Sequence, residues 1–200
     1  MTMLLYFAPG SSSMATHIAL HETGAPFERR LVSFAKKEQH LPDYLRVNPE
    51  GKVPTLVIDG RPLTEVAGTL YYLAKTYPEA RLWPQGGIEQ EAQTISWMSF
   101  IAATVHPARR AGNDRWREVF VLCEQRLGGR DWAVGGAYSI ADIHLFRLFW
   151  RFVDALSPDR GPYPGLFRHY DRMMARPAVQ KTIEIENNAG YEFPRNSVSV

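Results

Sequence analysis

Residues 48–65 decide the fold, and they read NPEGKVPTLVIDGRPLTE. The apolar run at residues 54–58 is typical of a strand, and Asp59-Gly60 is a strong hairpin signal because both residues tolerate the backbone angles of a tight turn. The chain then returns through residues 61–64 as an antiparallel strand. Glu65 begins a helix in which apolar residues recur at helical spacing. This stretch therefore predicts a β-hairpin followed directly by a helix.

The residues before this hairpin alternate strand and helix signals. Residues 4–8 form a short apolar run that ends at Pro9-Gly10. A helical pattern follows the serines at 11–13 and stops at Gly24, which suits a left-handed helix cap. Residues 27–33 indicate a second strand, and two strands joined through a helix form a parallel pair. The order βαβαββα is that of a thioredoxin-like α/β domain.

The residues after this domain carry helix signals only. Proline and glycine are concentrated in residues 78–87, which we interpret as a linker between a domain at residues 1–77 and an all-helical bundle at residues 88–200. Residues 140–156 are apolar nearly all round, which is typical of a central helix. From Asn187 onward, Gly, Pro, Asn and Ser predict a loop. Further helices are expected at residues 95–105, 116–127 and 166–176.

Composition limits the classes of function. The 200 residues carry 23 Lys and Arg against 21 Asp and Glu, a formal charge of +2, and no basic run is long enough for a nucleic-acid footprint. Cys123 is the sole cysteine, so an internal disulfide and a Cys/His metal cluster are excluded, and a reducing, cytoplasmic location is expected. The N-terminus lacks a signal-peptide pattern, and no apolar run is long enough to span a bilayer.

Four segments resemble glutathione transferases, and the bacterial beta class most closely. They are YFAPGSSS at residues 6–13, NPEGKVP at 48–54, LTEVA at 63–67 and SIAD at 139–142. Their order and spacing extend the resemblance over nearly the whole chain. The resemblance implies a thioredoxin-like domain that binds glutathione, a helical second domain, and a homodimer that joins glutathione to a small, hydrophobic electrophile without a metal.

The resemblance implies that the sulfur site lies at the serine cluster. Ser12 aligns with the beta-class cysteine and is the first candidate for stabilising the glutathione thiolate, with Ser11 second. Lowering a thiol pKa by about two units requires roughly 2.7 kcal/mol, which a hydroxyl hydrogen bond and a helix N-terminus together supply. Serine forms no mixed disulfide, so redox exchange is disfavoured, and Phe7 replaces a common family tyrosine. Helix capping is the alternative role for these serines.

Two further segments are implied to contact glutathione. Val53-Pro54 matches the family's cis-proline turn, which would expose the N–H and C=O of Val53 to an extended peptide; an ordinary trans proline is the alternative. Glu65 would hold the α-amino group, and the N–H of Val66 would bind the γ-glutamyl carboxylate; a plain acidic first-turn residue is the alternative. The family usually has Ser or Gly in place of Val66, which predicts weaker binding.

Four more side chains match contact positions of the family. Lys37 and Lys52 align with residues that reach the carboxylates of glutathione, and a solvated surface lysine is the alternative for each. Ser99 matches a glutathione contact from the helical domain. His106 matches a histidine directed at the sulfur, where it would stabilise the thiolate or move a proton; a structural role beside Pro107 is the alternative.

For two patterns in the helical half, we favour a structural role over a catalytic or binding role. The sequence Ser139-Ile140-Ala141-Asp142 is a capping box, so we expect Asp142 to serve folding rather than catalysis. Aromatic residues at helical spacing are usually core, although the same residues would line a site for the electrophile. The aromatic residues are Trp97, Phe100 and Trp116. Arg109 and Arg110 would join them in that site and favour an anionic substrate; a solvated pair is the alternative for these two arginines.

Two other functions stand beside conjugation. One is a glutathione-dependent isomerase, dehalogenase or ether-cleaving enzyme, which product analysis separates from a conjugating enzyme. The other is a glutathione-binding protein with little turnover, and Val66 and the absent cysteine and tyrosine favour it.

Overall fold

The computed structural model describes residues 1–192, which form two compact units. The first unit consists of Met1–Ala80 together with the described residues from Pro177 onward. The second unit consists of Arg81–Arg176.

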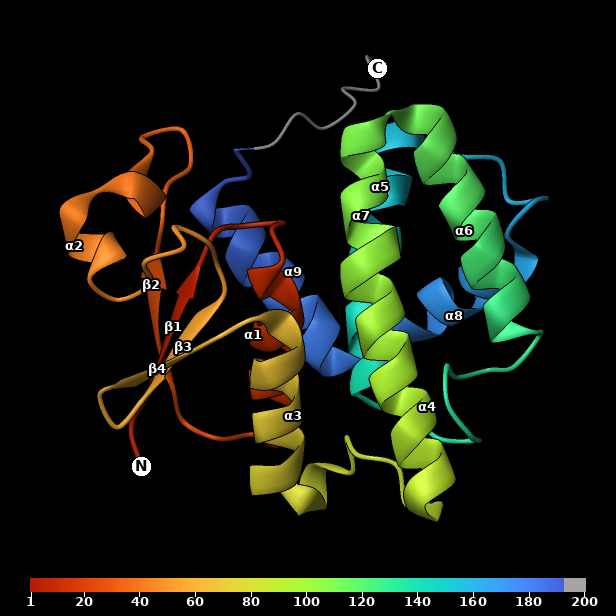
Figure 1. Ribbon diagram of the computed structural model, residues 1–200, viewed down its shortest axis with the longest axis horizontal. Helices are drawn as coiled ribbons and strands as arrows, with labels where there is room; N and C mark the ends of the chain where they lie inside the picture. Colours follow the sequence, from red (N-terminus) through yellow and green to blue (C-terminus); the bar gives the residue numbers. More distant parts are fainter. Residues whose placement is uncertain (193–200) are drawn as a thin grey trace. The chain divides into compact units, whose positions relative to one another are not determined.

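The first unit is built on a four-stranded mixed sheet (Figure 1). Its strands, in the spatial order β2-β1-β3-β4, confirm the expected α/β thioredoxin-like topology because β1 and β2 are parallel and the β3–β4 hairpin is antiparallel. The connecting helices bring the order to βαβαββα, and Gly24 ends α1 with a φ of 67°. The elements are β1 (Met3–Phe7), α1 (Ser13–Thr23), β2 (Glu28–Leu31), α2 (Pro42–Leu45), β3 (Thr55–Ile58), β4 (Arg61–Thr64) and α3 (Val66–Thr76).

Alternation along β1 gives the sheet two apolar faces. Leu5 pairs with Leu56 of β3, and both side chains are fully buried, as are Met14 and Ile18 of α1. Tyr6 points to the opposite face, where it forms a second apolar cluster with Tyr44 and Val53. Because side chains of a strand alternate between faces, β1 is covered on both sides, which explains its nearly continuous apolar sequence.

The second unit is all-helical around α7 (Ile140–Leu156), whose bounds agree with the expected central helix. The rings of Phe120, Phe149 and Phe152 pack with centroids 4.5–5.8 Å apart in its core. Ser139 caps α7, and the capping box with Asp142 is confirmed. The other helices are α4 (Gly87–Phe100), α5 (His106–Ala108), α6 (Asn113–Leu127) and α8 (Pro164–Met174).

The helix expected at residues 95–105 contains a π-helical segment that periodicity does not reveal. This segment, Ile101–Val105, closes with a bond from the N–H of His106 to the C=O of Ile101. Pro107 follows at once, and a proline ring clashes with the carbonyl four residues before it in an ordinary α-helix. The wider π turn therefore lets the helix continue through Pro107 instead of breaking.

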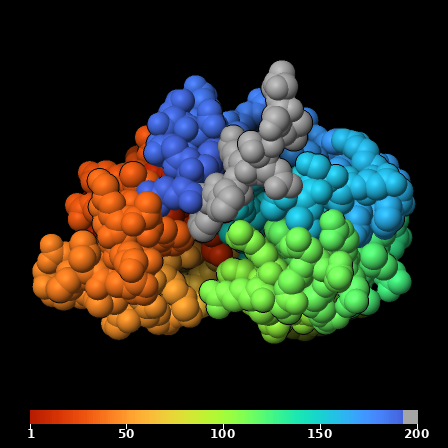
Figure 2. Space-filling model, turned by 90° about the horizontal axis from the view of Figure 1, so that it is seen from above, coloured from red at the N-terminus to blue at the C-terminus, as the bar shows by residue number. Residues whose placement is uncertain are grey.

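Helix α9 (Pro177–Ala189) belongs to the first unit, which differs from the domain expected at residues 88–200. It packs against α1, and Figures 1 and 2 show it in blue beside the red and orange N-terminal segments. It also includes Asn187, where a loop was expected, while the rest of that predicted loop from residue 193 lies outside the described residues. Buried Val179, Thr182 and Glu186 recur at helical spacing on its packed face.

Candidate functional site

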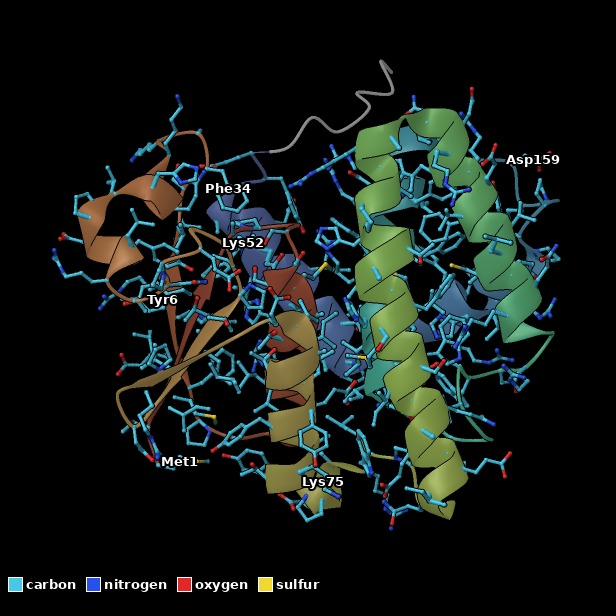
Figure 3. All side chains as sticks on the ribbon, viewed as in Figure 1. Met1, Tyr6, Phe34, Lys52, Lys75 and Asp159 are labelled. Carbon is cyan, nitrogen blue, oxygen red and sulfur yellow. The ribbon has the colours of Figure 1, made fainter. Side chains whose placement is uncertain are left out.

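Strand register brings four segments to one end of the sheet. Phe7 pairs with Leu31 in parallel, so β1 and β2 end at the same edge. Tyr6 pairs with Thr55, and Thr55 with Thr64, so β3 begins and β4 ends there too. The segments at residues 8–13, 32–37, 48–54 and 65–66 therefore border this edge. Figure 3 labels Phe34 and Lys52 at this end of the first unit and Met1 and Lys75 at the other.

The serine cluster at this edge forms a closed turn. Ser13 Oγ accepts from the N–H of Ala8 at 3.1 Å and donates to the C=O of Ala8 at 3.2 Å. Ser11 Oγ accepts from the N–H of Ser13 at 3.2 Å and lies 2.8 Å from Ser13 Oγ. When Ser13 donates to Ala8, the Ser11 hydroxyl donates to Ser13. Both side chains are buried, so these two serines hold the turn between β1 and α1.

Ser12 differs from both of its neighbours. It is half-buried, stands at the N-cap of α1, and makes no side-chain capping bond. The alternative role of helix capping therefore does not apply to Ser12, whose backbone already has helical angles, with φ −59° and ψ −23°. Its hydroxyl lies at the positive end of an 11-residue helix, where the dipole favours an anion.

A buried carboxylate from α9 braces the same turn. Glu186 Oε2 accepts from the N–H of Gly10 at 2.7 Å, and Glu186 Oε1 lies 3.0 Å from His17 Nδ1. The side chains of Glu186 and His17 are fully buried, so His17 is a packed residue. Sequence reasoning missed Glu186 because its partners lie 169 and 176 positions earlier. Its one local signal is a charged residue on the apolar face of a helix.

Replacing Glu186 with glutamine should lower the free energy of unfolding by about 1–3 kcal/mol, since the buried carboxylate becomes a neutral amide that forms weaker hydrogen bonds. Urea unfolding followed by circular dichroism measures the loss. Glu184→Gln on the exposed side of α9 removes the same charge, and we expect a change within about 0.5 kcal/mol. Equal stability of both variants would contradict the bracing role of Glu186.

The turn before β3 leaves a peptide unit open. The Val53–Pro54 bond is cis, as the resemblance implied. The C=O of Lys52 accepts from Tyr44 Oη at 2.5 Å and from Asn48 Nδ2 at 2.8 Å, which holds the turn. Within residues 1–192, the N–H and C=O of Val53 form no backbone hydrogen bond. They are therefore available to an extended peptide lying alongside.

Glu65 stands immediately before α3 rather than within its first turn, which corrects the sequence-based position. It has φ 62° and ψ 132°, a conformation uncommon outside glycine, and its side chain is exposed without a capping bond. Such angles are concentrated at functional sites because surrounding structure must hold them. Val66 is the first helical residue, so its N–H belongs to the helix N-terminus.

The two lysines are exposed at this end of the unit. Lys52 Nζ lies 3.1 Å from Glu50 Oε2 in an exposed ion pair. Lys37 adopts φ 55° in the segment after β2. A third group there is Glu192, which sequence reasoning missed: its carboxylate accepts from Ser33 Oγ and the N–H groups of Phe34 and Ala35 at 2.5–2.8 Å. These bonds lower the pKa of Glu192 although partial burial opposes the shift.

Ser99 and His106 lie in the second unit, both exposed, on α4 and α5 of one continuous helical run. His106 is close enough to His144 to contribute to its pKa, which falls to about 3 mainly because His144 is buried and secondly because of Arg147. His144 is therefore a packed residue. Trp97 and Trp116 are core residues of this unit, as aromatic residues at helical spacing usually are.

Residues 1–192 do not favour a cysteine nucleophile, a metal centre or a membrane span. Burial raises the pKa of Cys123 to about 12, so this thiol is not a nucleophile at neutral pH. In that range no three His, Cys, Asp or Glu side chains gather as metal ligands would. Nor does any helix within it have the length and apolar character needed to cross a membrane.

Comparison with known proteins gives one consistent result. Residues 1–75 match the glutathione S-transferase N-terminal domain, and residues 93–177 match the C-terminal domain. Glutathione S-transferase GST-4.5 of Xanthomonas campestris pv. campestris is 32% identical over 92% of this chain and 98% of its own. Two structures at 32% identity and TM-score 0.81 cover 92% of this chain and 98% of theirs: a sphingomonad glutathione S-transferase complexed with glutathione, and the bacterial beta class enzyme of Sphingomonas chungbukensis. This chain belongs to the glutathione S-transferase family.

Proposed function

We propose that this protein is a glutathione transferase that activates glutathione as a thiolate for attack on a small, hydrophobic electrophile. The observation that carries the proposal is the half-buried Ser12 hydroxyl, which makes no capping bond at the N-terminus of α1. It borders the same sheet edge as the open peptide unit of Val53. Family membership and a glutathione complex of a relative support glutathione as the co-substrate. The proposal includes no metal.

In this proposal, glutathione lies as an extended peptide across the sheet edge. Its backbone pairs with the N–H and C=O of Val53 beside Pro54. Its γ-glutamyl carboxylate binds the N–H of Val66 at the start of α3, and its α-amino group pairs with Glu65. Lys37 and Lys52 are assigned to the carboxylates at the exposed end, and Ser99 adds a contact from the helical unit.

The sulfur of glutathione lies at Ser12, whose hydroxyl donates a hydrogen bond to the thiolate. Ser11 supports the turn. The thiol proton leaves to solvent or to His106. The sulfur electron pair then forms a bond to an electrophilic carbon, and either a leaving group departs with its electrons or the product takes up a proton. A homodimer and a cytoplasmic location complete the proposal.

Glu65→Gln should weaken glutathione binding about tenfold, because a charge-assisted hydrogen bond to the α-amino group is replaced by a neutral one. Isothermal calorimetry measures the dissociation constant. Glu28→Gln removes the same charge from an exposed position on β2 and should bind as the wild type does. A Glu65→Gln affinity equal to that of Glu28→Gln would remove Glu65 from the glutathione site.

The function itself is tested on the unaltered protein. Calorimetry measures glutathione affinity, and thiolate absorbance against pH measures the pKa of the bound thiol. We expect binding, a pKa well below the ordinary value near 8.5, and glutathione consumed in conjugates with small electrophiles. Binding with an unshifted pKa and no rate above background identifies a binding protein instead. Turnover without glutathione consumption identifies an isomerase, and absent binding overturns the proposal.

A further inference from the structure

A second site is present at the other end of the first unit. An open cavity of about 330 Å³ lies where the end of α1, the loop at residues 24–27, the start of β2 and one face of α9 meet. Glu28 at the start of β2 pairs with Leu4, whereas the candidate glutathione site borders the edge at Phe7 and Leu31. The cavity is therefore separate from the serine turn.

The polar lining of this cavity is basic. Arg29 and Lys181 both line it, and neither forms an ion pair with any of residues 1–192. No Asp or Glu side chain lines it. His21 adds a third polar group: its Nε2 is buried and has no hydrogen-bond partner within the described chain. A buried nitrogen without a partner is costly, so an acceptor placed here gains a hydrogen bond that the free protein lacks.

The lowered pKa of His21 agrees with a positively charged lining. Burial lowers the pKa of His21 to about 4, and repulsion from His17 on α1, Lys181 on α9 and Arg29 on β2 lowers it further in that order. Lys181 and Arg29 are therefore both close enough to His21 to make the potential at its ring positive. An anion that enters would relieve this repulsion and raise the pKa of His21.

The rest of the lining is apolar. Leu20 is fully buried, and Phe27 and Ile185 are half-buried beside it. The ring of Phe27 packs edge-on against His21, with centroids 5.2 Å apart. The volume is at the lower end of the range of small-molecule sites. A cavity lined by these apolar side chains and by the cations Arg29 and Lys181 suits a ligand with a small apolar body and one anionic end.

We propose that this cavity binds a small aromatic carboxylate, with its ring against Leu20, Phe27 and Ile185. Its carboxylate would pair with Arg29 and Lys181 and accept from His21 Nε2. The guanidinium of Arg29 can meet a carboxylate through two parallel hydrogen bonds, which favours a carboxylate over a neutral aromatic compound. This function goes beyond glutathione transfer and does not depend on it.

The probe for the test is 2-naphthoate, titrated into the full-length protein at neutral pH. Fluorescence measures the dissociation constant, and the ring signals of ¹³C-labelled histidine report the site, with His21 assigned through its loss in His21→Gln. We expect saturable binding, a shifted His21 signal and a raised His21 pKa. Arg29→Gln and Lys181→Gln should each weaken binding about tenfold, as the loss of one charge-assisted bond predicts.

Two further variants keep the test falsifiable. Arg61→Gln removes one positive charge from an exposed position on β4 outside the cavity and should bind 2-naphthoate as the wild type does. Ala25→Phe fills the cavity with all charges retained and should abolish binding. The proposal is overturned if 2-naphthoate does not bind, if the His21 signal stays unmoved, or if Arg29→Gln and Lys181→Gln match Arg61→Gln.

Discussion

Replacing Asp142 with alanine should lower the free energy of unfolding by about 3–5 kcal/mol, the cost of removing one partner from a buried polar network. The carboxylate of Asp142 is fully buried and accepts from the N–H groups of Ala133 and Ser139 at 2.7 and 2.8 Å. It also meets Ser139 Oγ and His169 Nε2, each at 3.0 Å. Alanine leaves these groups buried without an acceptor. Urea unfolding followed by tryptophan fluorescence measures the change.

The control for this variant is another aspartate in the first turn of a helix. Asp114 of α6 is almost fully exposed and lies 3.7 Å from Arg117. Asp114→Ala should therefore change stability by at most about 0.5 kcal/mol. Asp142→Asn keeps one oxygen acceptor and should fall between wild type and Asp142→Ala. A stability of Asp142→Ala close to that of Asp114→Ala would show that the network is not a folding determinant.

Replacing Ser12 with alanine should reduce kcat/KM below neutral pH by about 10- to 100-fold. The lost bond from a hydroxyl to a charged sulfur is worth about 1.5–3 kcal/mol, which corresponds to a rise of about one to two units in the pKa of the bound glutathione thiol. Activity should then recover as the pH rises, because the thiolate forms without help. The measurements are thiolate absorbance against pH and the pH profile of kcat/KM with one electrophile.

Two variants separate chemistry from structure at this turn. Ser12→Thr retains the hydroxyl and should keep the thiol pKa near that of the wild type. Ser11→Ala removes a hydroxyl already bonded within the turn to Ser13, so we expect lower stability with little change in the thiol pKa. If Ser12→Ala leaves the pH profile unchanged, Ser12 does not stabilise the thiolate, and His106 becomes the residue to substitute.

Local patterns predicted much of the architecture correctly. The hairpin at Asp59-Gly60, the strands around it, the left-handed cap at Gly24 and the central helix Ile140–Leu156 are all present where the residues indicated. Each depends on interactions within a few positions of the chain. Turns, helical spacing and caps can therefore be predicted from a single sequence. The resemblance added the cis bond at Pro54, which no local pattern specifies.

Long-range packing limited the prediction of the candidate site. All three serines suit a helix cap, yet Ser11 and Ser13 close the turn on Ala8 while Ser12 makes no capping bond. Three identical residues in a row acquire different surroundings only after β1 and α1 pack. By contrast, helical spacing was sufficient for Trp97 and Trp116, since it identifies the apolar face that enters the core.

The sequence by itself determined the element order, the hairpin, the capping box and, through its four motifs, the family. Tertiary structure decided which side chains meet: Glu186 of α9 braces Gly10, His169 joins Asp142, and Arg29, Lys181 and His21 line one cavity. Periodicity and turn chemistry report on neighbours along the chain. Contacts between residues far apart in the chain depend instead on how whole elements pack, which one sequence does not encode locally.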